Sequence, residues 1–182
     1  AEQGGGLIVV GSYVPKTTAQ VQALLALPNI LSLEIDVATL LEPAARVAAI
    51  AEIQAATEMA MAAGQDVLLY TSRALVTGND AASSLAIGQQ VSSALVAIVA
   101  GLTVKPRFLV AKGGITSSDL ATQALQVRRA MVMGQIIPGV PVWRLGDESR
   151  MPGLAYVVFP GNVGGNDALA VVHEKLARQR VD

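Results

Sequence analysis

Two glycine-rich segments of the sequence have the residue types of an anion-binding loop. In residues 108–121, FLVAKGGITSSDLA, an apolar run is followed by Lys112, paired glycines, hydroxyl side chains and Asp119. In residues 157–170, VVFPGNVGGNDALA, an apolar run leads into a cluster of glycines with Asn162. Adjacent glycines permit positive φ angles and let backbone N–H groups point at a ligand, and the dipole of a following helix reinforces this. Both segments therefore favour binding of a phosphate or a similar anion.

Each segment also has a purely structural interpretation. In residues 108–121, Ser117 or Ser118 could cap a helix while the glycines form only a tight turn. A cap needs one hydroxyl and no paired glycines, so the ligand-binding interpretation is favoured there. For residues 157–170, the corresponding alternative is a capped turn without a ligand.

A third, weaker signal lies at residues 9–20, VVGSYVPKTTAQ, for which a turn followed by an ordinary helix N-cap is the favoured interpretation when it is taken alone. Gly11 would let a ligand approach the backbone, Ser12 can hydrogen-bond a phosphate or a base, and Thr17 or Thr18 can cap the helix that follows. Neither GxxxxGK[ST] nor GxGxxG occurs in the chain, so the common nucleotide-binding motifs are not indicated.

The other polar candidates favour structural roles. His173 is the single histidine, so a triad or metal cluster built on imidazoles has no second ring to use. Trp143 is expected in the core. Two carboxylate pairs could help hold Mg²⁺ and two arginines could clamp an anion, but solvated side chains are the favoured interpretation. These residues are Glu34 with Asp36, Asp147 with Glu148, and Arg144 with Arg150.

Short apolar runs bounded by turn residues predict the strands that position these segments. The runs are mostly continuous rather than alternating, as expected for a sheet covered on both faces. The predicted strands are residues 7–11, 31–35, 66–72, 107–112, 142–145 and 155–159. Helical patterns are found at residues 16–25, 43–63, 80–100, 118–126 and 166–179.

The alternation of strands and helices predicts an α/β fold, with a largely parallel sheet covered by helices on both faces. The length predicts a single domain over residues 1–182. In such sheets the ligand lies where loops leave the carboxyl ends of the strands, which is where the glycine-rich segments fall. The apolar helix at 80–102 could pack in the core or form a dimer face, so a homo-oligomer is a possible state.

Composition and charge exclude several classes of function. The net charge is −1 with basic residues spread along the chain, so we expect no nucleic-acid partner. Polar residues between Gln89 and Ser93 interrupt the most apolar helix, so we expect no membrane span. The absence of cysteine rules out disulfides and thiolate metal sites and fits a cytoplasmic protein. The opening residues, AEQGGG, run almost directly into a strand, which predicts a fragment of a longer protein.

The order of GS at 11–12, KGGITSSD at 112–119 and PGNVGG at 160–165 resembles the four-carbon acid sugar kinase family. The resemblance is to the C-terminal nucleotide-binding domain and covers nearly the whole chain. It implies that this domain binds ATP with Mg²⁺, while an N-terminal domain absent from the chain holds a small sugar acid such as threonate. Phosphoryl transfer would then need no covalent intermediate, and the general base is expected on the absent domain.

Carried over by motif, the resemblance implies that Ser12 lies in the nucleotide site and that the two glycine-rich segments surround the phosphates. The implied phosphate cradle is Gly113, Gly114, Ile115 and Thr116, and the implied closing residues are Gly161, Asn162 and Gly164. Ile115 stands where many members have an acidic residue in a GGET-like loop, and PGNVGG replaces the commoner SGNFG. Both departures indicate a divergent subgroup.

Two alternatives stay open at this point. The first is a non-catalytic regulatory or assembly module that retains an anion site, suggested by the missing acidic residue at Ile115. The second is an unrelated α/β enzyme whose glycine-rich loops bind the phosphate of a metabolite.

Overall fold

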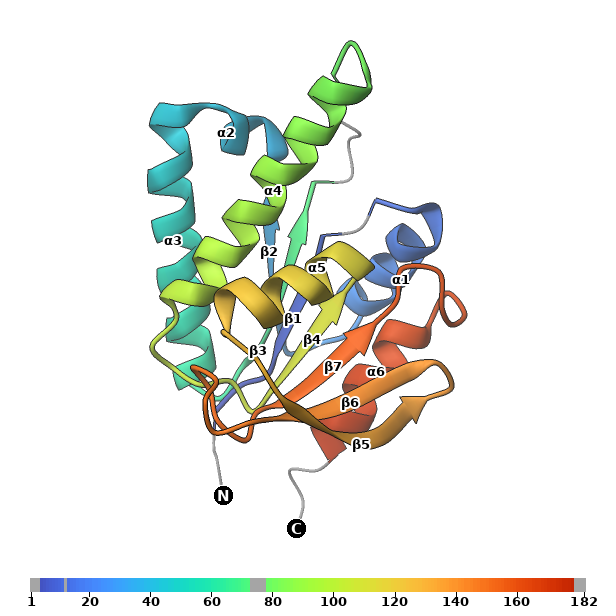
Figure 1. Cartoon of the computed structure of the whole chain (residues 1–182). Coiled ribbons are helices and arrows are strands. Elements are labelled where there is room, and N and C mark those ends of the chain that lie inside the picture. The colour runs from blue at the N-terminus through green and yellow to red at the C-terminus, as the bar shows by residue number, and fades with distance from the viewer. Residues whose placement is uncertain (1–3, 12, 73–77, 179–182) are drawn as a thin grey trace.

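The protein is built on one seven-stranded sheet, seen in Figure 1. The computed structural model describes residues 4–11, 13–72 and 78–178. The strands are β1 (Leu7–Val10), β2 (Ile30–Ile35), β3 (Asp66–Thr71), β4 (Phe108–Lys112), β5 (Ala130–Ile137), β6 (Val140–Leu145) and β7 (Ala155–Phe159). Their order is β2-β3-β1-β4-β7-β6-β5. The strands from β2 to β7 are parallel, and β6 and β5 are antiparallel, so the predicted largely parallel sheet is confirmed.

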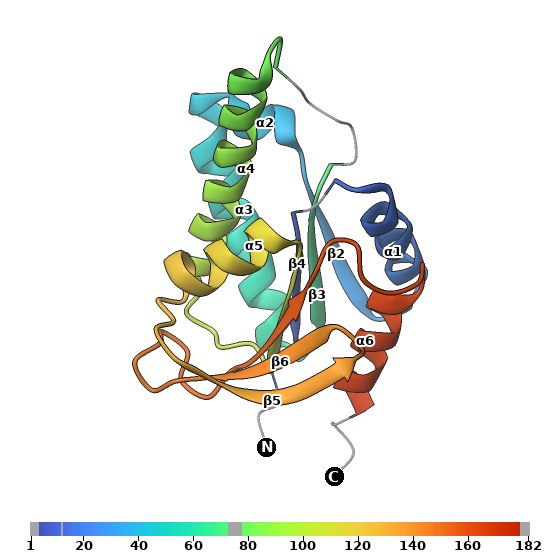
Figure 2. The same ribbon diagram turned by 45° about the vertical axis from the view of Figure 1, so that its right-hand side comes forward.

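Helices cover both faces of the sheet, as predicted. They are α1 (Pro15–Leu25), α2 (Val37–Leu41), α3 (Pro43–Ala62), α4 (Ala81–Gly101), α5 (Gly114–Asp119), a π-helical turn η1 (Leu120–Ala124) and α6 (Ala168–Ala177). Figures 1 and 2 show α1 and α6 together on one face, and α3, α4 and α5 on the other. One sheet with helices on both faces confirms the predicted α/β fold class.

The central strand β1 shows why the predicted strands are continuously apolar. Leu7 and Val9 belong to the core cluster under α3 and α4, whereas Ile8 and Val10 belong to the cluster under α1 and α6. All are 0% exposed. Successive side chains of a strand point to opposite faces, so a strand covered on both sides has no polar position.

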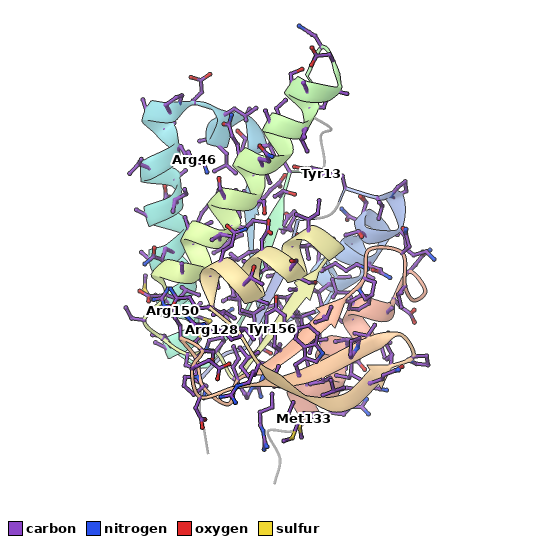
Figure 3. All side chains as sticks on the ribbon, viewed as in Figure 1. Tyr13, Arg46, Arg128, Met133, Arg150 and Tyr156 are labelled. Carbon is purple, nitrogen blue, oxygen red and sulfur yellow. The ribbon has the colours of Figure 1, made fainter. Side chains whose placement is uncertain are left out.

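The edge strand β5 was not predicted. Residues 130–135 are all exposed, and Met131, Val132 and Met133 are each more than half exposed. Figure 3 shows Met133 at the outer edge of the sheet. Only the end of β5, at Ile136 and Ile137, packs against the core on the α6 side. The exposed residues 130–135 are under no packing requirement to show a periodic pattern, so this segment carried no strand signal.

The long helix α4 divides into two parts. From Val91 onward its apolar stripe is buried against the sheet, whereas residues 81–90 extend beyond the sheet and leave Leu85 63% exposed (Figure 1). The sequence predicted no membrane span, yet α4 is the one described helix whose length and composition would allow it to cross a membrane. Core helices meet the same criterion. The buried half of α4 shows that this part of the stripe serves the core.

Candidate functional site

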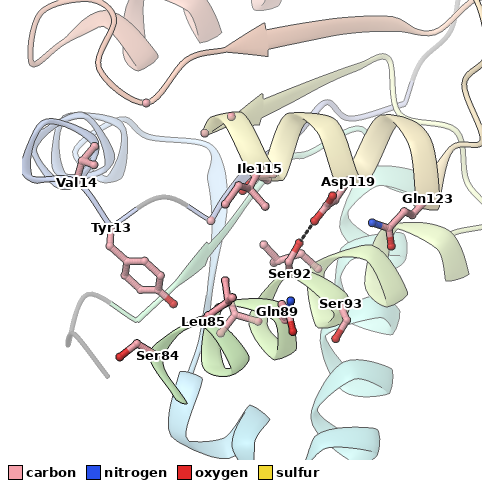
Figure 4. Close-up of a pocket in the computed structure, with 18 of the residues that line it drawn as sticks. Tyr13, Val14, Ser84, Leu85, Gln89, Ser92, Ser93, Ile115, Asp119 and Gln123 are labelled. Carbon is pink, nitrogen blue, oxygen red and sulfur yellow. Dashed lines mark hydrogen bonds between the residues drawn. The ribbon is translucent and has the colours of Figure 1, made fainter. Parts of the chain in front are cut away.

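The candidate site lies where the chain leaves two neighbouring strands in opposite directions. β1 is followed by α1 on one face of the sheet, and β4 is followed by α5 on the other. Ligands of open α/β sheets bind at such a switch point, outside the carboxyl ends of the strands. A cavity of about 770 Å³ lies there (Figure 4).

Most of the ligand residues predicted from the sequence line this one cavity. They are Gly113, Gly114, Ile115, Thr116, Gly161 and Asn162. Gly164 does not line it. Its φ of +82° serves a turn, which Gln20 holds by hydrogen bonds to the carbonyls of Val163 and Gly165. Ser12 lies outside the described residues. The predicted contacts of all these residues with ATP stay predictions.

The loop between β4 and α5 has a backbone that only glycine adopts easily. Gly113 has φ 113° and ψ 144°, and its N–H donates to the carbonyl of Phe159 at 2.8 Å. The hydroxyl of Ser117 donates to the carbonyls of Ala111 and Gly113 at 2.8 and 2.7 Å. Ser117 therefore fixes the loop from within and does not face a ligand.

The buried Tyr156 supports the same loop from β7. Its hydroxyl donates to the carbonyl of Ser117 at 2.7 Å, and burial raises the pKa of this phenol well above its usual value. Trp143 stacks on its ring at 6.1 Å between centroids and, although only partly buried, packs against the core cluster, close to the predicted core position.

Unpaired backbone N–H groups meet at the cavity. The first N–H groups of a helix have no partner within it, and α5 presents those of Gly114, Ile115 and Thr116. The N–H groups of Gly161 and Asn162 donate to no backbone carbonyl of the described residues. Donors from two segments far apart in the sequence thus border one space, an arrangement suited to an anion.

Gly11 is required by close packing at the base of the cavity. A Cβ atom at this position would lie 2.4 Å from Oγ1 of Thr116 and 2.9 Å from Cδ1 of Leu95. The absence of a side chain at Gly11 therefore lets Thr116 approach the end of β1, which keeps the floor of the cavity compact.

The opposite wall of the cavity comes from α4, which the sequence did not predict as part of the site. Ser92 of α4 donates a hydrogen bond to the carboxylate of Asp119 at the last turn of α5 (Figure 4). Gln89 and Gln123 lie beside this pair. Asp119 and Gln123 were also missed from the sequence. The signal that could have pointed to them was their spacing from Thr116, which is typical of one helical face.

The other sequence candidates lie outside the cavity. Asp36 caps α2 through Thr39, whose hydrogen bonds lower the pKa of this carboxyl, and Glu34 accepts from the hydroxyl of Tyr70. Glu148 accepts from the N–H of Arg129. None of these lines the cavity, and the described residues contain no group of three potential metal ligands.

The two candidate arginines have local structural contacts. Arg150 donates to the carbonyls of Ala100 and Ala124, at the C-terminal ends of α4 and η1. Arg144 extends to the sulfur of Met131 on the neighbouring strand at 3.4 Å. Neither arginine lies at the cavity.

His173 lies beside the amino ends of the strands, at the end of the sheet opposite to the cavity. Its Nε2 is 2.9 Å from the carboxylate of Asp66, which also accepts from Arg107 at 3.1 Å and from the N–H of Gly6 at 2.7 Å. His173 is 8% exposed. Of the surface or packing role expected for His173, the structure shows packing: the ring belongs to a buried ionisable cluster.

Comparisons with known proteins agree with this geometry. A family model described as a nucleotide-binding C-terminal domain matches residues 7–169. No curated protein shows significant similarity to the chain.

Three solved structures share the fold. One is a domain of unknown function from Bordetella bronchiseptica, a domain-swapped dimer with bound citrate, at 23% identity and TM-score 0.74. The others are a Salmonella typhimurium protein provisionally described as a tRNA synthase (19%, 0.71) and a Haemophilus influenzae protein (18%, 0.72). The alignments cover 95%, 94% and 95% of this chain but 41%, 41% and 40% of theirs. The chain thus spans less than half the length of these structures.

Proposed function

This chain belongs to the four-carbon acid sugar kinase family as its nucleotide-binding C-terminal domain, and from this premise we propose that the cavity binds ATP. The whole protein would transfer the terminal phosphoryl group to a small acid sugar. The observation that carries the proposal is the meeting of unpaired N–H groups from residues 114–116 and 161–162 at one cavity.

The walls of the cavity support an orientation for the nucleotide. The phosphates would lie at the glycine end, and the nucleoside would extend along α5 toward Asp119. At 1.5 Å per residue, Asp119 lies roughly 7.5 Å along the helix from Gly114, which suits the separation of the outer phosphates from the ribose. Asp119 would then accept hydrogen bonds from ribose hydroxyls, as carboxylates do in dinucleotide-binding folds.

Charge neutralisation at the phosphates would need Mg²⁺. No lysine or arginine of the described residues lines the cavity, and Asp119 is its one carboxylate. Mg²⁺ at nucleotide sites keeps several waters and takes most of its other ligands from the phosphates, so this donor set fits a cation that arrives with ATP. When bound, the ion would offset the charge that develops during phosphoryl transfer.

The acid sugar and the general base would come from the rest of the protein. The chain covers about two fifths of the related structures, which supports an additional N-terminal domain that holds the sugar. The related Bordetella structure is a domain-swapped dimer, which supports a homo-oligomer for the whole protein.

Calorimetry of the full-length protein with ATP or ADP and Mg²⁺ tests the proposal. We expect a dissociation constant below about 1 mM, equivalent to more than about 4 kcal/mol of binding free energy. A folded sample that binds neither nucleotide at millimolar concentration would contradict it.

Replacing Asp119 with alanine should weaken ATP binding by about tenfold or more, because hydrogen bonds to a charged group contribute about 1.5–3 kcal/mol. The same variant should bind 2′-deoxy-ATP or 3′-deoxy-ATP with little further loss, since the ribose contact is already gone. Isothermal titration of the three nucleotides against both proteins measures this. If the variant discriminates ribose from deoxyribose as the wild type does, Asp119 has another role.

A non-catalytic module is the second candidate function. The observation that favours it is Ile115, which is 73% exposed and lines the cavity where many family members have an acidic residue. Phosphorylation of a four-carbon acid by the full-length protein, followed by mass spectrometry, would exclude this alternative.

A further inference from the structure

Lys112 is a buried cation without a carboxylate partner. It ends β4 with 0% exposure, and its Nζ donates to the carbonyls of Pro160 at 2.8 Å and Gly161 at 3.1 Å. The Nζ also lies 4.0 Å from the centre of the Phe159 ring. No ion pair of Lys112 is found among the described residues. Burial of an unpaired charge is unfavourable, so stability does not explain the presence of a lysine at this position.

Two groups of α1 hold the same turn. Nζ of Lys16 donates to the carbonyl of Asn162 at 3.3 Å, and Oγ1 of Thr17 donates to the carbonyl of Gly161 at 3.2 Å. Together with Lys112, they engage the successive carbonyls of residues 160–162. All these donors lie on the α1 side of the turn.

Because the peptide bond is planar, holding these carbonyls also fixes the direction in which the neighbouring N–H groups point. In a trans peptide, the carbonyl of one residue and the N–H of the next point to opposite sides, and the described chain has no cis peptide. With the carbonyls of Pro160 and Gly161 drawn toward Lys112, the N–H groups of Gly161 and Asn162 must face away from it. Both residues line the cavity, and neither N–H donates to a described backbone carbonyl.

We propose that Lys112 is a positioning residue which, with Lys16 and Thr17, holds the carbonyls of the 160–162 turn and thereby directs two backbone N–H groups at a nucleotide phosphate. This inference rests on the proposed nucleotide site. It assigns Lys112 an indirect role, because the lysine itself is not part of the cavity lining.

The charge of Lys112 should matter as well as its shape. Burial, and secondarily the charge of Lys16, lowers the pKa of Lys112 to about 8. Of the neighbouring elements, α1 contributes the charged Lys16, whereas β1 and β7 contribute Val10 and Phe159 beside it in the sheet. The carboxylate of the cavity, Asp119, is bonded to Ser92. Hydrogen bonds from an ammonium are stronger than those from a neutral amine, so deprotonation should loosen the turn and remove a positive charge near the phosphate.

Nucleotide affinity and folding stability should therefore change in opposite directions with pH. The folded-state pKa of about 8 lies below the 10.5 of an unperturbed lysine. Between these values the unfolded chain binds more protons, so the contribution of Lys112 makes the fold more stable as the pH rises. ATP affinity should instead fall about three- to tenfold from pH 7.2 to 9.2, because the protonated lysine is lost.

Titration of full-length protein with Mg·ATP at several pH values, for the wild type and Lys112→Met, tests the positioning role of Lys112. We expect the variant to bind about tenfold or more weakly and to lose the pH dependence, with an unchanged or higher melting temperature. Thr17→Val, nearly isosteric, should weaken binding severalfold and covers the case in which Lys112→Met does not fold. Lys105→Met is the matched control, because Lys105 donates to the carbonyl of Pro152, away from the cavity lining.

The two proposals fail in different ways. If the wild type binds ATP, and folded Lys112→Met binds it equally well or keeps the pH dependence, the positioning role of Lys112 is overturned while the proposed nucleotide site stands. If the wild type binds no nucleotide at any pH, both proposals are overturned.

Discussion

Replacing Gly114 with alanine is expected to weaken ATP binding about tenfold or more while leaving the fold intact. Gly114 begins α5, and its φ is not among the positive values that favour glycine. A Cβ atom there would have no heavy atom within 4 Å, so the substitution meets no steric obstacle in the protein. The added methyl would instead occupy the cavity beside the N–H groups of α5, where it would push a phosphate away. Loss of a hydrogen bond to a charged group amounts to about 1.5–3 kcal/mol, equivalent to roughly ten- to a hundredfold in affinity.

Gly88→Ala is the matched control for this variant. Gly88 lines the same cavity from α4, and a Cβ atom there would also be free of contacts within 4 Å. Because it is a helix-interior glycine, alanine should stabilise the protein by up to about 1 kcal/mol. We expect Gly88→Ala to bind ATP within about threefold of the wild type. Calorimetry and urea denaturation of both variants measure the two effects, and equal affinity for Gly114→Ala and wild type would refute the phosphate position.

The largest expected effect on stability follows removal of the buried carboxylate of Asp66. The substitution Asp66→Ala takes away the acceptor that Arg107, His173 and the N–H of Gly6 share. The side chain of Asp66 is 5% exposed, and loss of one member of a buried ionic cluster typically costs about 3–5 kcal/mol. For a domain of this size, the melting temperature should fall by roughly 10 °C.

Glu174→Ala provides the comparison for Asp66. The pair of Glu174 with Arg178 is solvent-exposed, with side-chain exposures of 52% and 80%, so its loss should change stability by less than about 1 kcal/mol. Thermal and urea unfolding of both variants give the two values. Since Asp66 lies at the amino end of β3, at the end of the sheet opposite to the cavity, ATP affinity of the folded Asp66→Ala protein should stay close to that of the wild type. Similar unfolding curves for the two variants would show that the buried cluster contributes little.

Strands buried on both faces could be predicted from the sequence, and the exposed edge strand could not. Val9 and Leu69 pack under the helices of one face, which leaves a continuous apolar run as the visible sign of the strand. β5 is held mainly by backbone hydrogen bonds to β6, which any residue type can make. For the same reason, Val132 at 68% exposure carries no pattern that would have distinguished this segment from a loop.

The glycine-rich segments that border the cavity were also visible in the sequence, because their conformations restrict the residue type. Gly113, at φ 113°, adopts a backbone that disfavours side chains, and Gly11 leaves room for Thr116. Gly164 shows the limit of this reasoning. Its φ of +82° equally requires glycine, but the turn it forms packs against α1 and does not reach the cavity.

Local chain chemistry thus determined which segments turn sharply, which strands are buried and where anions could meet backbone N–H groups. The tertiary structure decided which of these segments share one cavity, because that depends on strand order and on which face each helix covers. It also decided the roles of polar residues whose local sequence allowed several. From the sequence, Ser92 was only a polar interruption of an apolar helix, but in the structure it donates a hydrogen bond to Asp119. Lys112 could have faced a ligand, but its Nζ instead donates to carbonyls of the 160–162 turn, outside the cavity lining. A side chain's partners depend on the elements packed against it, and the spacing of residues along the chain does not encode them.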